Sequence, residues 1–190
     1  AGLDDLDYRR FFDINELVAL RMERPAVLAA HHRMVLELVA RGQVHGLRVD
    51  HVDGLADPRQ YLERLRAAGV GFVVVEKILR PGEDLPADWD ADGTTGYEFI
   101  AAVAPLLVDP RGFATLEAAF CRATGHESWQ ACARAARHEV LADGLAPALR
   151  RLAADLHLLA QEDPRACDVS RQELEQALAA LTAELPVHRT

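Results

Sequence analysis

Two short apolar runs that each end in a carboxylate constrain this chain more than any other feature. Residues 46–50 read Gly-Leu-Arg-Val-Asp, and residues 72–76 read Phe-Val-Val-Val-Glu. Such runs are typical of buried parallel strands, and in barrel enzymes the carboxyl ends of these strands carry the active site. The pattern therefore predicts two parallel strands, over 46–50 and 71–76, that deliver Asp50 and Glu76 to one edge of a sheet.

The segment between the two runs predicts a crossover helix. Asp57 and Pro58 suit the N-cap and first position of a helix that Gly69 closes. Apolar residues at helical spacing predict another helix over residues 25–41. Strand, helix and strand make the βαβ unit of a parallel sheet. Since an eight-stranded barrel needs about 250 residues, we expect a portion of a TIM (β/α)8 barrel, with two strands and flanking helices.

The second half of the chain is expected to be an all-α lobe. Beyond a Gly- and Pro-containing loop over residues 79–96, periodicity predicts helices at about 97–107, 113–124, 127–142, 145–161 and 170–184. Ser170 and Glu173 fit a capping box. The fold is therefore expected to be α/β in two parts, a partial catalytic barrel segment over residues 1–96 and a helical subdomain over 97–190. A short helix is also expected at residues 15–22, with Asn15 as its N-cap.

Composition limits the classes of partner. The formal charge of −9 argues against nucleic acid and against an anionic membrane surface. No apolar run approaches the length that spans a bilayer. Three cysteines without close pairing favour free thiols, and so a cytoplasmic location. Because the chain opens with Ala1 rather than Met, we expect it to be a piece of a longer protein.

Asp50 and Glu76 suit different chemical roles. Arg48 lies two residues before Asp50, on the same strand face, and an adjacent arginine keeps a carboxylate ionised, as a nucleophile requires. A purely structural Arg–Asp pair is an equally good interpretation. Apolar surroundings of Glu76 would favour the protonated form of a general acid, and the alternative is solvent pairing with Lys77. At matching strand ends the carboxylates approach the roughly 5–5.5 Å of a retaining glycosidase.

Other polar residues near these strands are candidate substrate contacts. An aromatic and cationic cluster at residues 8–13 offers donors and ring faces to a sugar, or anchors the chain to the barrel. The polar loop 92–97 either contacts a sugar or caps the following helix. Lys77 is the only lysine among 21 basic residues, which suggests that an ammonium is required there. The run from Asp50 to Asp53 lacks a second set of ligands, so no metal is expected.

These residues resemble signature regions of the alpha-amylase superfamily of glycoside hydrolases. Residues 47–50 are similar to its second region, whose Asp is the nucleophile, and residues 75–76 to its third, whose Glu is the acid/base. The stretches 8–17, 46–55, 74–79 and 92–97 are closer to the trehalose-forming branch. Ordinary amylases often carry Lys-His where this chain has Asp53-Gly54, which also favours that branch. The resemblance covers about residues 8–100.

The resemblance implies a fragment of an intramolecular transglycosylase that acts on maltooligosaccharides. It would convert the reducing-end α-1,4 linkage to an α,α-1,1 linkage by retaining double displacement, without a metal or other cofactor. Asp50 would be the nucleophile and Glu76 the acid/base. The expected substrate contacts are Arg48, His51, Lys77, Tyr8, Arg9, Arg10, Thr94, Thr95 and Tyr97.

The resemblance also implies a third catalytic Asp in the remainder of the parent barrel, so this chain alone is expected to be inactive. Two alternatives stay open. One is a fragment of a related α-glucan hydrolase or glucanotransferase, and the other is a helical interaction module whose carboxylates are structural.

Overall fold

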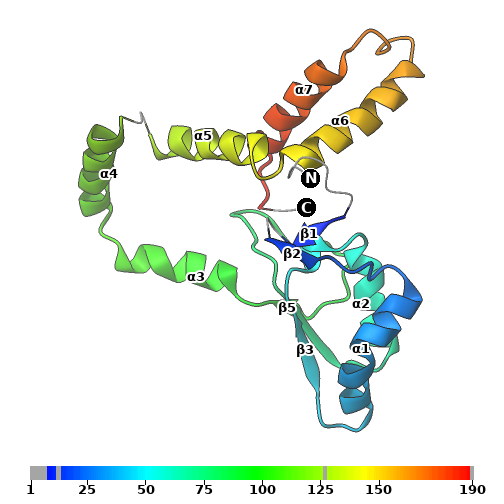
Figure 1. The fold of residues 1–190 in the computed structure, drawn as a ribbon. Helices are drawn as coiled ribbons and strands as arrows, with labels where there is room; N and C mark the ends of the chain where they lie inside the picture. Colours follow the sequence, from blue (N-terminus) through cyan, green and yellow to red (C-terminus); the bar gives the residue numbers. More distant parts are fainter. Residues whose placement is uncertain (1–7, 12–13, 126–127, 189–190) are drawn as a thin grey trace. The chain divides into compact units, whose positions relative to one another are not determined.

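The computed structural model describes residues 8–11, 14–125 and 128–188. The chain divides into two compact units, whose helices and strands are labelled in Figure 1. The sheet unit comprises Leu20–Val108 with Pro186–Thr190, and the helical unit comprises Ala1–Ala19 with Asp109–Leu185. The expected division at residue 96, between a barrel segment and a helical subdomain, stays a prediction.

The sheet unit is an α/β arrangement around a small parallel sheet. Its elements in chain order are α1 (Pro25–Ala40), β3 (Gly46–Val49), the 3-10 turn η2 (Val52–Gly54), α2 (Pro58–Ala67), β4 (Phe72–Val75), β5 (Gly93–Thr94), α3 (Tyr97–Val103) and the 3-10 turn η3 (Ala104–Leu107). The strands pair in parallel in the order β3-β4-β5. The two expected strands and their crossover helix are therefore confirmed, with ends shifted by about one residue.

Helix α2 begins where its sequence signals place it. The Asp57 side chain accepts a hydrogen bond from the backbone N–H of Gln60 at 2.9 Å, and Pro58 occupies the first turn, where a missing N–H costs nothing. Gly69 follows the helix with a φ of 89°, a left-handed conformation that glycine adopts without strain. This turn leads the chain directly into β4.

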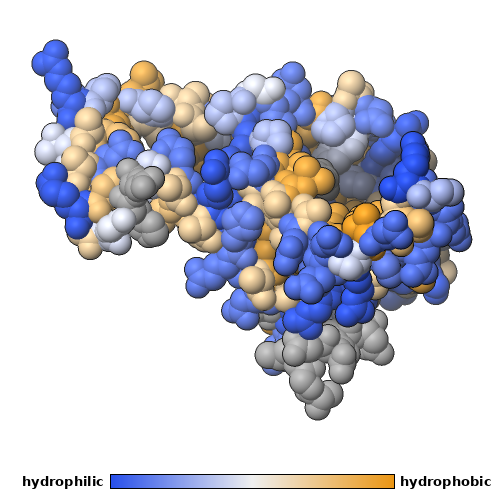
Figure 2. Space-filling model, turned by 90° about the horizontal axis from the view of Figure 1, so that it is seen from above, coloured by the Kyte–Doolittle hydropathy of each residue, from blue (hydrophilic) through white to orange (hydrophobic). Residues whose placement is uncertain are grey.

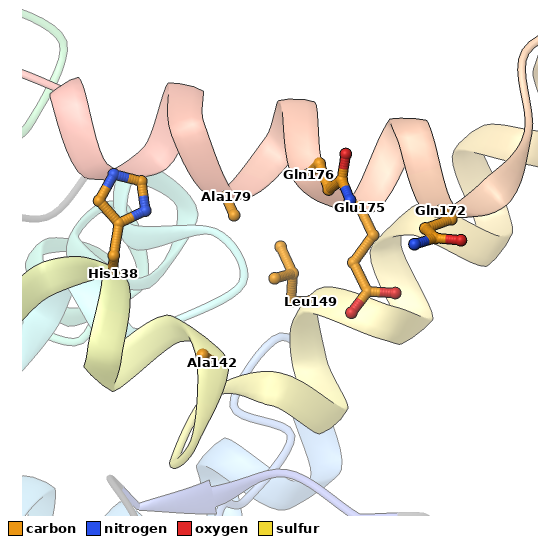
Figure 3. Close-up of a pocket in the computed structure, with 7 residues that line it drawn as sticks. All are labelled: His138, Ala142, Leu149, Gln172, Glu175, Gln176 and Ala179. Atoms are coloured by element: carbon orange, nitrogen blue, oxygen red, sulfur yellow. The ribbon is translucent and has the colours of Figure 1, made fainter.

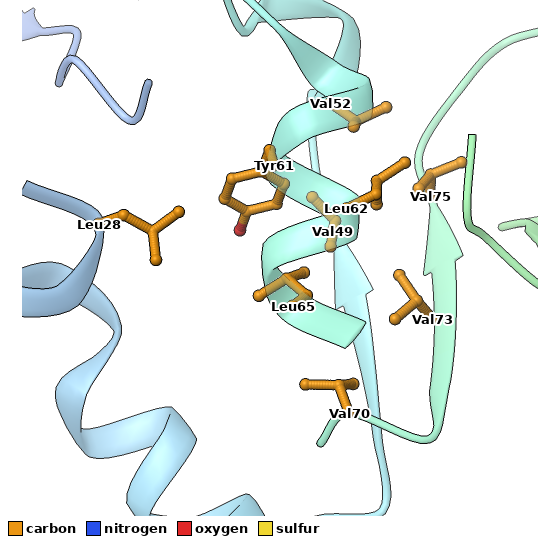
Figure 4. Packing of buried hydrophobic residues seen from close by; sticks show 9 residues of the cluster. All are labelled: Leu28, Val49, Val52, Tyr61, Leu62, Leu65, Val70, Val73 and Val75. Carbon is orange, nitrogen blue, oxygen red and sulfur yellow. The ribbon is translucent and has the colours of Figure 1, made fainter. Parts of the chain in front are cut away.

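One face of the sheet packs against α1 and α2. Val49, Val73 and Val75 alternate along β3 and β4 and point into a cluster with Leu62 and Leu65 of α2 (Figure 4). The remaining members of this cluster are Leu28, Val52, Tyr61 and Val70. On the opposite face Phe72 is 53% exposed. The sheet thus buries one apolar face under helices and leaves the other uncovered within the described residues.

The loop after β4 returns to the sheet and supplies its third strand. The Asp92 carboxylate accepts hydrogen bonds from the backbone N–H of Val73 and from the Arg66 guanidinium, both at 2.7 Å. These two hydrogen bonds hold the pKa of Asp92 below its usual value, and the bond from the Val73 N–H has the larger effect. The adjacent residues Gly93 and Thr94 then pair with Val74 and Val75. The 79–96 loop, expected to be irregular, therefore contains a short strand.

The helical unit contains four longer helices and a two-stranded hairpin among its described residues. These are β1 (Arg10–Phe11), β2 (Ile14–Val18), α4 (Pro110–Thr124), α5 (Trp129–Ala142), α6 (Ala146–Gln161) and α7 (Arg171–Glu184). The capping box of Ser170 and Glu173 is confirmed, with both reciprocal hydrogen bonds formed. Arg137 of α5 donates to the carbonyl oxygen of Ala183 at 2.8 Å, which ties α5 to α7.

The prediction of a helix at residues 15–22 is wrong. Ile14–Val18 is a strand that pairs antiparallel with Arg10–Phe11. The Asn15 side chain does not cap a helix, because its Oδ1 accepts a hydrogen bond from Arg10 at 2.7 Å and its carbonyl accepts one from Tyr8 at 3.0 Å. Branched Ile14 and Val18 also favour extended backbone.

Many large apolar side chains lie on the surface of the described residues, and apolar patches stand among hydrophilic residues in Figure 2. Leu106 and Leu107 of η3, for example, are 82% and 84% exposed. Within the described ranges no single helix has the length and apolarity to cross a bilayer. The consecutive helical segments Tyr97–Leu107 and Pro110–Thr124 meet those criteria only when taken together.

The packing of α1 on α2 is expected to weaken in acid. His32 is buried, its Nε2 lies 2.7 Å from the Tyr61 hydroxyl, and its Nδ1 has no partner among the described residues. Burial, and then the neighbouring His31, lower the pKa of His32. His32 therefore binds a proton at a higher pH in the unfolded chain than in the folded one. The free energy of unfolding should consequently decrease as the pH drops below about 6.5.

Chemical denaturation between pH 8 and pH 5 measures this effect. The variant His32→Gln should lose part of the acid-dependent fall, whereas His45→Gln, at an exposed position, should retain it. Identical pH dependence in wild type and His32→Gln would contradict the assignment.

Candidate active site

The register of β3 and β4 brings Asp50 and Glu76 to neighbouring strand ends. Val49 is paired with Val75, and the backbone N–H of Glu76 donates to the Val49 carbonyl oxygen at 2.8 Å. Asp50 and Glu76 are the next residues on their strands. The sheet therefore sets both carboxylates at its carboxyl edge, as the sequence predicted.

Arg48 links the two acids. One of its guanidinium nitrogens lies 2.9 Å from Asp50 Oδ1 and 3.9 Å from Glu76 Oε1. The two oxygens are therefore within roughly 7 Å of each other, a separation that admits the paired carboxylates of glycoside-cleaving enzymes. The Asp50 side chain is 63% exposed and the Glu76 side chain 28%. A solvent-exposed pair of this kind adds only about 0–1 kcal/mol of stability, so its main effect is on position and local charge.

Glu76 is held through both of its carboxylate oxygens. The backbone N–H of His51 donates to Oε2 at 3.1 Å, and the Tyr97 hydroxyl donates to Oε1 at 3.2 Å. One donor comes from the turn after β3 and the other from the start of α3. The two segments on either side of Glu76 thus fix the orientation of its side chain.

The turn after Asp50 has a strained conformation. His51 has a φ of 52°, and it is the only described non-glycine residue with positive φ. Such a backbone conformation is costly and clusters at functional sites. The His51 ring packs on Gly54, where an added Cβ would lie 2.7 Å from ring atoms. Glycine at position 54 is therefore needed for this placement of His51.

The 92–97 loop lies beside the same sheet edge. The Thr95 N–H donates to the Val75 carbonyl oxygen at 3.0 Å, one residue before Glu76. Thr94 Oγ1 donates to Glu98 and accepts from the Gly96 N–H. Thr95 Oγ1 is buried and has no partner among the described residues. Of the residues expected to contact substrate in this loop, Tyr97 is hydrogen-bonded to Glu76. Thr94 is instead hydrogen-bonded to residues at the start of α3.

Lys77 points into the protein. Its side chain is 2% exposed, and Nζ lies 3.0 Å from Glu83 Oε1. Burial would raise the pKa of Glu83, but the backbone N–H of Arg80 and the Lys77 ammonium outweigh it, so that the pKa falls below its usual value. This position favours a structural ion pair, and a contact between Lys77 and substrate stays a prediction.

Tyr8, Arg9 and Arg10 belong to the helical unit. Tyr8 donates to Asn15 as described above, the Arg9 carbonyl accepts from the Ala19 N–H at 2.9 Å, and Arg10 also donates to the carbonyl of Gly144 at 3.2 Å. These contacts connect the hairpin to its own unit. Phe12 and Asp13 of the same cluster lie outside the described residues.

The helical unit also contains a shallow pocket of about 500 Å³ between α5, α6 and α7 (Figure 3). His138 and Glu175 contribute polar groups to its wall, and Leu149 contributes an apolar surface. It contains none of the expected site residues. Across the described ranges, no group of three or more His, Cys, Asp or Glu side chains is arranged to hold a metal ion.

The fold and the site together define an α/β segment with an acid pair at the carboxyl edge of a parallel sheet. Comparison with known proteins then identifies similar sequences and solved structures. "Putative maltooligosyl trehalose synthase" of Mycobacterium tuberculosis is 45% identical over 113 residues, which are 58% of this chain and 15% of that protein. No family model matches the chain.

Solved structures agree in both sequence and fold. The maltooligosyltrehalose synthase from Arthrobacter ramosus is 38% identical with a TM-score of 0.85, over 98% of this chain and 23% of that one. A glycosyltrehalose synthase, DSM5389, is 32% identical with a TM-score of 0.79, over 97% of this chain and 23% of that one. The expected similarity to the trehalose-forming branch is thus confirmed: the chain is homologous to one segment of maltooligosyl trehalose synthases, and spans less than a quarter of the solved ones.

Replacing Gly54 should destabilise the turn that carries His51. In Gly54→Ala the new methyl group would lie 2.7 Å from the His51 ring, so the ring must move out of its present position. The matched control is Gly71→Ala, where the added Cβ lies 3.8 Å from the His45 carbonyl in ordinary contact. Denaturation should show a loss for Gly54→Ala and little change for Gly71→Ala. Equal effects would contradict the packing argument.

Proposed function

We propose that this chain is a segment of a longer intramolecular transglycosylase that places an α,α-1,1 trehalose linkage at the reducing end of maltooligosaccharides. The observation that carries the proposal is the acid pair, Asp50 and Glu76 at adjacent strand ends with Arg48 within 4 Å of both. The relatives bear the name of that activity. The half-exposed Phe72 on the sheet face opposite the helices is what a piece of a larger barrel would present.

The proposed reaction has two displacement steps. Asp50 attacks the anomeric carbon of the reducing-end α-1,4 linkage while Glu76 gives its proton to the departing oxygen, which leaves a glycosyl ester and a free glucose. Glu76, now a carboxylate, takes the proton from the anomeric hydroxyl of that glucose. The hydroxyl oxygen displaces Asp50, and the product carries an α,α-1,1 linkage.

The surrounding groups suit these two roles. The Arg48 guanidinium lies 2.9 Å from Asp50 and orients the carboxylate that acts as nucleophile. Glu76 is the less exposed of the two acids, which limits competition from water at the oxygen that handles the proton. The longer protein would supply the third catalytic Asp and the rest of the sugar site.

Turnover of maltopentaose by the full-length protein that contains this chain tests the proposal. Wild type should form a non-reducing product with little release of reducing sugar. Asp50→Asn and Glu76→Gln should each lower kcat at least 100-fold, because each removes one chemical step. Asp84→Asn, an exposed loop acid, is the matched control and should keep wild-type turnover.

Two results would overturn the proposal. Near-normal turnover by either acid variant would show that the carboxylates are structural. Predominant release of reducing sugar by wild type would instead identify an α-glucan hydrolase that uses the same acid pair.

A further inference from the structure

We propose that Tyr97 is a positioning residue for Glu76, and that its hydroxyl keeps Oε1 as the oxygen that carries the transferable proton. This inference rests on the proposed function and assigns Tyr97 a role other than direct contact with the sugar. It follows from the two hydrogen bonds to Glu76, which come from donors of different kinds.

The donor at Oε2 cannot change its role. The His51 backbone N–H, 3.1 Å away, can only donate. A proton on Oε2 would face that N–H and lose the hydrogen bond. Its direction is fixed by the left-handed backbone of His51. Oε2 is therefore reserved as an acceptor in both protonation states of Glu76.

The donor at Oε1 can change its role. A tyrosine hydroxyl both donates and accepts, so the Tyr97 hydroxyl, 3.2 Å from Oε1, donates to the carboxylate and accepts from the protonated acid. The Arg48 guanidinium also lies 3.9 Å from Oε1, but Oε1 is the oxygen at which a proton leaves both hydrogen bonds to Glu76 intact, so the proton resides there. In the first step the Oε1–H bond turns from Tyr97 to the departing glycosidic oxygen and gives it the proton, and the Tyr97 hydroxyl then donates to the carboxylate. In the second step Oε1 takes a proton from the anomeric hydroxyl.

Tyr97 is itself held in place by the sheet. The Thr95 N–H is bonded to the Val75 carbonyl oxygen at 3.0 Å, and Gly96 turns the chain with a φ of 94° into α3. These two residues set the start of α3 beside the end of β4. The tyrosine at the first position of α3 thereby faces the acid at the end of that strand.

The experiment uses Tyr97→Phe in the full-length protein that contains this chain. With maltopentaose, kcat should fall about tenfold at unchanged KM, well short of the 10²–10⁴-fold attributable to a general acid. With α-maltosyl fluoride, whose leaving group needs little protonation, most of the deficit should disappear.

Tyr61→Phe is the matched control, since it removes a hydroxyl bonded to His32 inside the core. It should leave the ratio of the rates on the two substrates unchanged. A higher KM alone in Tyr97→Phe would mean a substrate contact, and equal losses on both substrates would mean general damage. Either result overturns the inference if Glu76→Gln is inactive, whereas an active Glu76→Gln overturns the proposed function itself.

Discussion

The parallel pairing of β3 with β4 is the constraint on which the candidate site depends. Val49 lies opposite Val75, and the bond from the Glu76 N–H to the Val49 carbonyl extends the pairing to the end of both strands. A slip of one residue would turn Val73 and Val75 away from α2 and expose them. The burial that stabilises the sheet unit therefore also fixes which two acids stand side by side.

Around this fixed pair, the orienting groups come from separate segments. Arg48 lies on β3 itself, His51 lies in the turn that follows, and Tyr97 begins α3 after a long loop. The positive φ of His51 opposes local stability, and the hydrogen bond from its backbone N–H to Glu76 supports it. Asp92 anchors the loop through Val73 and Arg66. Packing of the core thus holds the carboxyl edge of the sheet in place, although this edge is strained at His51 and partly exposed to solvent.

The sequence predicted those parts whose signals are local. The strands ending at Asp50 and Glu76, the Asp57 cap and the capping box of Ser170 follow from short patterns. Strand β5 has two residues in a polar loop, and its pairing depends on a contact between Asp92 and a distant backbone group. The strand Ile14–Val18 is paired with Arg10–Phe11, and a local sequence pattern does not reveal such a partner. The capping signal of Asn15 therefore favoured a helix in the prediction. The burial of Lys77 against Glu83 and the contact of Tyr97 with Glu76 likewise depend on tertiary placement.

The chain matches less than a quarter of the solved relatives' length and yet holds a complete acid pair with its orienting groups. We propose that Asp50 bonds covalently to the sugar. Peptide mass spectrometry of the full-length Glu76→Gln protein after incubation with α-maltosyl fluoride tests it most directly, since the first step then proceeds while the second is slowed. The account predicts a glycosyl ester on the peptide that contains Asp50. An adduct on another residue would contradict it, as would turnover of the fluoride with inversion and no adduct.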